Sequence, residues 1–142
     1  MDRGILQALR DDGRLSMAAV GRLVGLSAPA VAERVRRLEG AGVIAGYHAA
    51  VDRASLGRPL LAFVRVATAG GVGRAVAEAA SASPAVLEVH RVTGDDCYVL
   101  KVAVRDVGAL EAEVDRYVRF GRVTTSVVLT TVAERRATLD AE

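Results

Sequence analysis

The hydrophobic pattern of this chain changes character once, and that change constrains the fold more than any other feature. In the first part, apolar residues recur every three or four positions, as on amphipathic helices. From residue 60 onward, β-branched runs alternate with further helical stretches. The stretch DRASLGRP between the two parts has the turn-rich composition of a linker. The sequence therefore predicts an α+β chain with two small domains, 1–52 and 60–142, and a linker at 53–59.

Three short helices are predicted in the first part. Ser16 and Ser27 are each placed to cap a helix N-terminus, and Gly25 can adopt the left-handed conformation of a tight turn between the last two helices. The side chains expected on the three buried faces are Ile5, Leu6 and Leu9; Val20, Leu23 and Val24; and Val31, Val35 and Leu38. A short extended segment is expected at 43–51. Three helices with a glycine turn before the last one are typical of a helix-turn-helix, whose last helix enters the DNA major groove.

The third helix, within LSAPAVAERVRRLE, carries three arginines that are candidates for contacting DNA. At 100° per residue, Arg36 lies opposite the buried stripe, Arg37 flanks that outer face, and Arg34 lies nearer the buried one. The predicted contacts are Ser27, Arg36 and Arg37 at phosphates, with Ala28, Pro29, Ala30, Glu33 and Arg34 where the helix approaches base edges.

Charge is distributed unevenly between the two parts. Residues 1–59 hold nine arginines against six acidic residues, a net +3, whereas residues 60–142 hold ten basic against eleven acidic residues, a net −1. This is the pattern expected if the first part meets a polyanion. The alternative is a solvated helix face on which the arginines pair with Glu33 and Glu39.

The second part predicts a βαββαβ order. The expected strands are 60–68, 86–93, 98–104 and 123–132. The two intervening helices are expected at 72–83 and 107–120, the second with an apolar stripe of Val107, Leu110, Val114, Tyr117 and Val118. This order gives a four-stranded sheet with both helices on one face. The other face is rich in apolar residues, so a second copy of the same sheet is expected to cover it.

Several classes of function are excluded by the composition. A single cysteine, Cys97, and two histidines, His48 and His90, provide no metal-site spacing and no internal disulfide. No apolar run approaches the ~20 residues of a membrane span, and there is no leader, so we expect a cytoplasmic chain with no membrane partner. No phosphate loop, paired catalytic acids or base near Cys97 is present, so neither an enzyme nor a cofactor is expected.

The pattern GLSxxxVxxRVRRLExxGVIxGY, in residues 25–47, resembles the DNA-binding half of the Lrp/AsnC (feast/famine) transcriptional regulators of bacteria and archaea. The stretch TGDDCYVLKVAV resembles the ligand-sensing domain of the same family, and the resemblance covers essentially the whole chain. It implies a winged helix-turn-helix followed by a ferredoxin-like βαββαβ domain for sensing and dimerisation. It also implies sequence-specific binding of double-stranded DNA by a homodimer that assembles further, often to an octamer.

The resemblance further implies an amino acid or related metabolite as effector, bound between dimers near the turn at 94–98. A glycine turn exposes backbone N–H groups to a carboxylate, while Asp95 or Asp96 can accept from an ammonium group. An ordinary β-hairpin turn is the alternative. The candidate effector residues are Gly94, Asp95, Asp96, Cys97, Tyr98, Thr124, Thr125 and Ser126.

Two positions depart from the family pattern. Cys97 stands where the family commonly has an acid, and residues 119–122 replace the usual Pro-Gly turn before the last strand. The remaining alternative for the whole chain is an architectural DNA-binding protein that responds to no effector.

Overall fold

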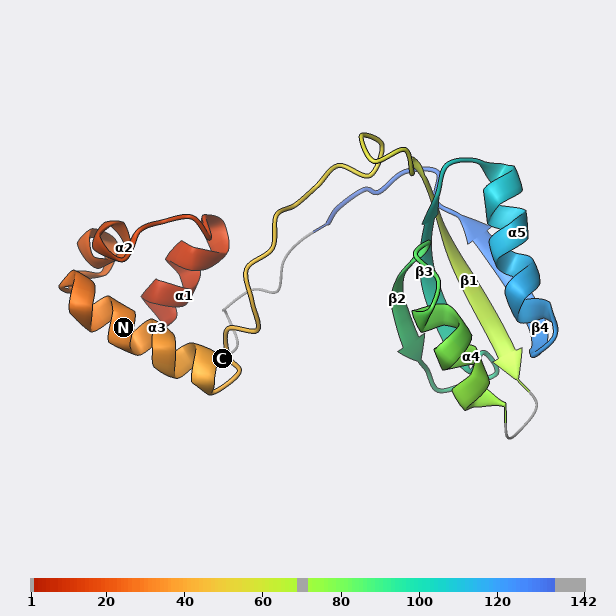
Figure 1. The fold of residues 1–142 in the computed structure, drawn as a ribbon, viewed down its shortest axis with the longest axis horizontal. Helices are drawn as coiled ribbons and strands as arrows, with labels where there is room; N and C mark the ends of the chain where they lie inside the picture. The colour runs from red at the N-terminus through yellow and green to blue at the C-terminus, as the bar shows by residue number, and fades with distance from the viewer. Residues whose placement is uncertain (1, 69–71, 135–142) are drawn as a thin grey trace. The chain divides into compact units, whose positions relative to one another are not determined.

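The computed structural model describes residues 2–68 and 72–134, which form two compact units: 2–50 with Glu134, and 51–68 with 72–133 (Figure 1). The first unit contains α1 (Asp2–Asp11), α2 (Met17–Val24) and α3 (Ala28–Gly40). The Ser16 hydroxyl accepts from the Ala19 N–H at 3.2 Å, and the Ser27 hydroxyl accepts from the Ala30 N–H at 3.4 Å. Gly25 has φ 72°. Both predicted caps and the predicted turn glycine are confirmed.

A small hydrophobic core holds the three helices together. Its buried members are Ile5, Leu9, Val20, Val31 and Val35. Leu23 was expected on the buried face of α2, but it is 67% exposed. It lies roughly 100° from the centre of that face, whereas Gly21 lies within it and is buried. Residues 43–51 follow α3 without forming a strand in the described part of the chain, so the expected extended segment has no paired wing there.

The second unit has the predicted βαββαβ order. Its elements are β1 (Leu60–Thr68), α4 (Gly73–Ser81), β2 (Val86–Arg91), β3 (Tyr98–Val104), α5 (Val107–Val118) and β4 (Gly121–Val127). The strand order is β2-β3-β1-β4, and every neighbouring pair is antiparallel. Figure 1 shows α4 and α5 on the same face of the sheet. Val64, Val66 and Leu100 are buried beneath them.

β4 differs from the predicted strand at both ends. The strand begins at Gly121, where a Cβ would lie 2.0 Å from the Ala67 carbonyl oxygen, so only glycine fits. β4 ends at Val127 because its pairing partner, β1, begins at Leu60. Val127 pairs with Ala62, and the next N–H, of Val128, donates to the Leu61 carbonyl near that start. Leu129 is 96% exposed beyond that point.

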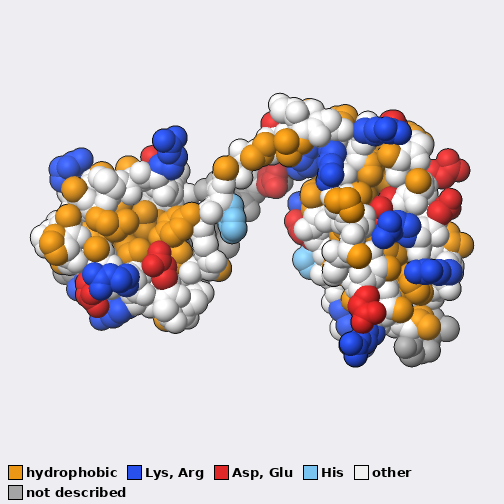
Figure 2. All heavy atoms as spheres, viewed as in Figure 1, with side chains coloured by type: hydrophobic (Ala, Val, Ile, Leu, Met, Phe, Trp, Pro, Cys, Tyr) orange, Lys and Arg blue, Asp and Glu red, His pale blue; other side chains and the backbone are white. Residues whose placement is uncertain are grey.

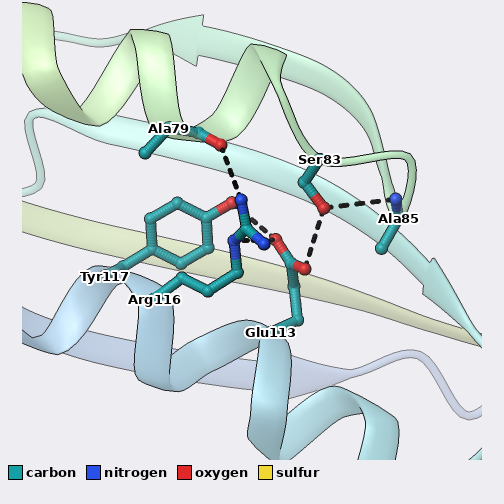
Figure 3. Close-up of polar contacts among 6 residues, drawn as sticks. All are labelled: Ala79, Ser83, Ala85, Glu113, Arg116 and Tyr117. Carbon is teal, nitrogen blue, oxygen red and sulfur yellow. Dashed lines mark hydrogen bonds and ion pairs between the residues drawn. The ribbon is translucent and has the colours of Figure 1, made fainter.

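α5 buries a carboxylate in place of part of its predicted apolar stripe. Val107 and Val118 are exposed, whereas Glu113 is buried beside Leu110 and Tyr117. The Tyr117 hydroxyl donates to Glu113 Oε1 at 2.6 Å, and the Ser83 hydroxyl donates to Oε2 at 2.8 Å (Figure 3).

This polar cluster connects α5 to the loop between α4 and β2. Ser83 Oγ also accepts from the Ala85 N–H, and Arg116 lies 3.8 Å from Glu113 while donating to the Ala79 carbonyl (Figure 3). Burial, reinforced by the adjacent Glu113 carboxylate, raises the pKa of Tyr117 well above its usual range. The hydroxyl therefore stays protonated and keeps donating.

Candidate nucleic-acid interface and effector site

All eight predicted DNA-contact residues lie in or directly before the first three turns of α3. The exposed members are Ser27, Pro29, Glu33, Arg36 and Arg37, and the half-buried members are Ala28, Ala30 and Arg34. Ser27 caps the helix, and the first turn of α3 carries only the small side chains of Ala28, Pro29 and Ala30. This end of α3 can therefore approach a nucleic-acid groove closely.

The three arginines of α3 differ in how strongly their charge is already paired. Arg36 binds Glu33 at 2.6 Å, and Arg34 binds Asp2 of α1 at 2.7 Å. The guanidinium of Arg37 makes no hydrogen bond or ion pair with any residue that the structure describes, although, besides the hydrogen bond from Arg34, its charge helps to lower the pKa of the Asp2 carboxyl. Basic and acidic side chains also lie side by side on the visible surface of the unit (Figure 2). Arg37 is therefore the α3 arginine whose charge is most available to a phosphate.

Asp2 is a residue that the sequence reasoning missed. Its hydrogen bond from Arg34 lowers the pKa of the Asp2 carboxyl, so the pair stays ionised at neutral pH. The two residues are 32 positions apart, and only the packing of α1 beside α3 brings them together. Asp2 thus already binds the guanidinium of Arg34, which is one of the residues predicted to contact DNA.

We expect Asp2→Asn to strengthen binding to DNA of unrelated sequence, because it removes a negative charge beside α3 and leaves the positive charge of Arg34 uncompensated. The slope of log K against log salt should steepen by up to about one unit. The measurement is fluorescence anisotropy over a salt series. Asp11→Asn is the matched control, since Asp11 contacts Arg10 and lies at the other end of α1. Identical slopes for both variants would show that Asp2 does not restrain Arg34.

The second candidate site begins at the loop between β2 and β3. Gly94 has φ 100°, a conformation that favours glycine. The Val92 N–H donates to the Cys97 carbonyl, and the Cys97 N–H donates to the Val66 carbonyl, which ties the loop to the end of β1. Asp95 is exposed and Asp96 and Cys97 are half-buried. Tyr98 is only 7% exposed because it packs into the core under the helices.

The predicted β4 residues divide between the two faces of the sheet. Thr124 pairs with Arg65 and Ser126 with Phe63, so both lie on the face away from the helices. Thr125 pairs with the buried Val64 and lies on the helix side. The structure therefore brings Thr124 and Ser126 together, and it separates Thr125 from them.

Arg65 of β1 links the loop to β4, and sequence reasoning missed it as well. One end of its guanidinium lies 3.9 Å from Asp96 Oδ2, and the other donates to Ser126 Oγ at 3.5 Å. The alternation in LLAFVRVAT could have placed Arg65 on the outer face. It could not have shown which strands flank β1.

Other kinds of site are not evident. The residues that the structure describes contain no cluster of three or more His, Cys, Asp or Glu side chains placed to hold a metal ion. Within the same ranges, no helix is long and apolar enough to span a bilayer. A hollow of about 840 Å³ lies between α1 and residues 43–50, and none of the predicted site residues line it.

A helix-turn-helix unit with an exposed basic helix, followed by a separate βαββαβ unit, is the arrangement of a DNA-binding protein that carries a second module. The model of the AsnC-type helix-turn-helix domain matches residues 1–39, and that of the Lrp/AsnC ligand binding domain matches residues 61–138. The chain belongs to the Lrp/AsnC family of transcriptional regulators. The predicted family, fold class and regulatory function are confirmed, as is the prediction that the chain is not an enzyme.

Similar proteins span nearly the whole chain. The uncharacterized HTH-type transcriptional regulator YezC of Bacillus subtilis is 42% identical over 128 residues, covering 90% of this chain and 91% of its own. The structure of B. subtilis LrpC has a TM-score of 0.89 at 30% identity and covers 94% of this chain and 96% of its own. The transcriptional regulator NMB0573 of Neisseria meningitidis, solved as an L-Met complex, has a TM-score of 0.88 at 27% identity, with coverages of 94% and 90%.

Proposed function

We propose that this regulator binds double-stranded DNA in the cytoplasm as a homodimer, through a DNA-binding domain at 1–52, a linker at 53–59 and an effector and assembly domain at 60–142. The observation that carries the proposal is the exposed, Ser27-capped start of α3, together with Arg37 in its last turn, whose side chain makes no ion pair with a described residue. Two α3 helices related by the dimer axis would enter successive major-groove faces of a quasi-palindromic site. Ser27, Arg36 and Arg37 hold phosphates, and Ala28, Pro29, Ala30, Glu33 and Arg34 lie near base edges.

The outer face of the sheet supports the proposed dimer. Phe63 is 39% exposed there, and the half-buried Val99 lies on the same face of the adjacent strand β3. A second copy of this face is the natural cover because symmetric pairing buries equivalent apolar surfaces against each other. Further association of dimers, to an octamer, places the loops at 94–98 near subunit boundaries.

An amino acid or related metabolite is the proposed effector, bound near Gly94, Asp95, Asp96, Cys97 and Tyr98 with Thr124, Thr125 and Ser126. The N. meningitidis relative in complex with L-Met supports this class of ligand. The effector would act by binding one assembly state more tightly than another, since equal affinity for both shifts nothing. The recognition helix itself need not change shape.

Arg37→Ala tests the DNA-binding proposal. Because Arg37 is expected at a phosphate, its loss should weaken binding to every DNA sequence and flatten the salt slope by about one unit. Anisotropy titrations of a specific and a scrambled duplex at several salt concentrations measure both effects. Arg74→Ala is the control, because Arg74 is exposed on α4 and pairs with Glu78. If the Arg37 variant kept the wild-type slope, this arginine would not lie at the phosphates.

A further inference from the structure

The hollow of about 840 Å³ in the first unit has a largely apolar lining, and we call it the α1 groove. Leu6 and Leu9 of α1 line one side, and Val43, Ile44 and Tyr47 of the segment after α3 line the other. Val43 is 57% exposed and Tyr47 is 47% exposed. Exposed apolar side chains that gather in a hollow are typical of a docking surface.

The wall of the α1 groove opposite the helix is formed by residues 45–50, which are neither helix nor strand. Contacts at two points hold this wall against the unit. The Ile44 N–H donates to the Leu38 carbonyl, and the Tyr47 hydroxyl donates to Glu39 Oε1 at 3.1 Å. No backbone group of 45–50 hydrogen-bonds to any residue that the structure describes. A row of unpaired N–H and C=O groups is a template to which an extended peptide can add.

The chain leaves the second unit beside the point where the linker enters it. The Val128 N–H donates to the Leu61 carbonyl at 2.9 Å. Ala50 lies eleven positions before Leu61, and Leu139 lies eleven positions after Val128. The linker also contains a hydrogen-bonded turn at 53–58, so it covers less distance than an extended chain of equal length. The residues around Leu139 can therefore reach the groove however the two units are placed.

We propose that residues 135–142 (RRATLDAE) of the same chain, which lie outside the described residues, dock in the α1 groove and pair with the backbone of 45–50. Glu134, directly before them, already belongs to the first unit. Leu139 is the one large apolar side chain among the eight and fills the apolar part of the groove. The docked segment is a second connection between β4 and the DNA-binding unit, besides the linker at 53–59.

The charges at the end of α1 suit this occupant. A segment that runs back beside the linker is antiparallel to it, so its last residues approach the turn after α1. That turn lies beside Tyr47, because a Cβ added at Gly13 would be 3.5 Å from the tyrosine ring. Arg14 lines the groove there, and the segment carries Asp140 and Glu142 on the far side of its leucine. Opposite charges therefore meet when the leucine is seated.

Hydrogen–deuterium exchange of the full-length chain, measured by mass spectrometry, tests the docking. The backbone amides of 45–50 should exchange at least about tenfold more slowly in the wild type than in Leu139→Asp, because a charged side chain disfavours the apolar groove. Leu129→Asp is the matched control. It makes the same substitution ten positions earlier, at a side chain that is 96% exposed, and should keep the wild-type exchange of 45–50.

Cross-linking identifies the copy that supplies the segment. Val43→Cys and Leu139→Cys are combined with Cys97→Ser in the full-length chain, which is then treated with a short bismaleimide. The cross-linked peptides should come from a band of monomer size on a denaturing gel, because the segment docks on its own chain.

Three results would overturn the inference. Exchange of the 45–50 amides as fast as that of unpaired backbone, in the wild type, would show that the groove is open. Slow exchange that Leu139→Asp leaves unchanged would mean that another occupant covers the groove, such as the 43–50 segment of a second copy. A cross-linked band of dimer size would mean that the segment docks on the partner instead of on its own chain.

Discussion

Gly21→Ala is expected to destabilise the DNA-binding unit by about 3 kcal/mol, at the upper end of ordinary overpacking. An added Cβ would lie 2.4 Å from the Leu26 carbonyl oxygen, which belongs to the turn between α2 and α3. Backbone atoms cannot yield as a flexible side chain can, so the turn must open. That movement breaks the hydrogen bond from the Leu26 N–H to the Gly21 carbonyl and displaces the start of α3. Because so small a core has little stability to lose, DNA affinity should fall with it.

Urea unfolding monitored by circular dichroism measures the stability of the Gly21 variant. Gly40→Ala is the matched control: it lies at the end of α3, where an added Cβ meets nothing within 4 Å. Alanine favours helix over glycine, so the control should be unchanged or more stable by up to about 1 kcal/mol. Equal stability of the two variants would mean that α2 and the turn do not pack as closely as described.

Glu113→Ala should destabilise the second unit by about 3 kcal/mol. The substitution removes the acceptor of two hydroxyl groups, those of Tyr117 and Ser83, and leaves both in a buried site. It also frees α5 from the loop between α4 and β2. We expect a decrease of about 12 to 24 °C in the melting temperature of this unit, measured by scanning calorimetry.

Glu111→Ala provides the comparison for the Glu113 variant, because Glu111 is an exposed glutamate on the same helix. Its loss should change stability by no more than about 0.5 kcal/mol. A similar loss in both variants would indicate that the cost comes from the helix rather than from the buried cluster.

Local signals explain why much of the fold was predictable from the sequence. Ser16 and Ser27 cap their helices through contacts only three residues away. The runs at 60–68 and 98–104 became strands with the predicted bounds, since alternation and β-branching are properties of the run itself. The end of β4 was not predictable in this way, because it depends on where β1 begins.

Apolar patterning alone misplaced some buried faces. It assigned Leu23 and Val107 to buried faces and missed Gly21 and Glu113. The burial of Gly21 depends on a close contact with the Leu26 backbone. The burial of Glu113 depends on the Ser83 hydroxyl, 30 residues away in the sequence. In the candidate sites too, contacts within one element could be predicted from the sequence, and contacts between distant residues could not. The α3 contacts follow from one helix, whereas the pairing of Arg34 with Asp2 and of Arg65 with Ser126 spans 32 and 61 residues.

The most direct test of the account is fluorescence anisotropy of the full-length protein on a labelled duplex from the DNA upstream of its own coding region. A scrambled duplex, two salt concentrations and a pool of amino acids complete the design. We expect tighter binding to the upstream duplex, weakening as salt rises, and a shift of that binding by the pool. Binding that the pool leaves unchanged would favour an architectural protein that responds to no effector. Equal or absent binding to both duplexes would contradict the central claim that α3 reads DNA for an effector-responsive regulator.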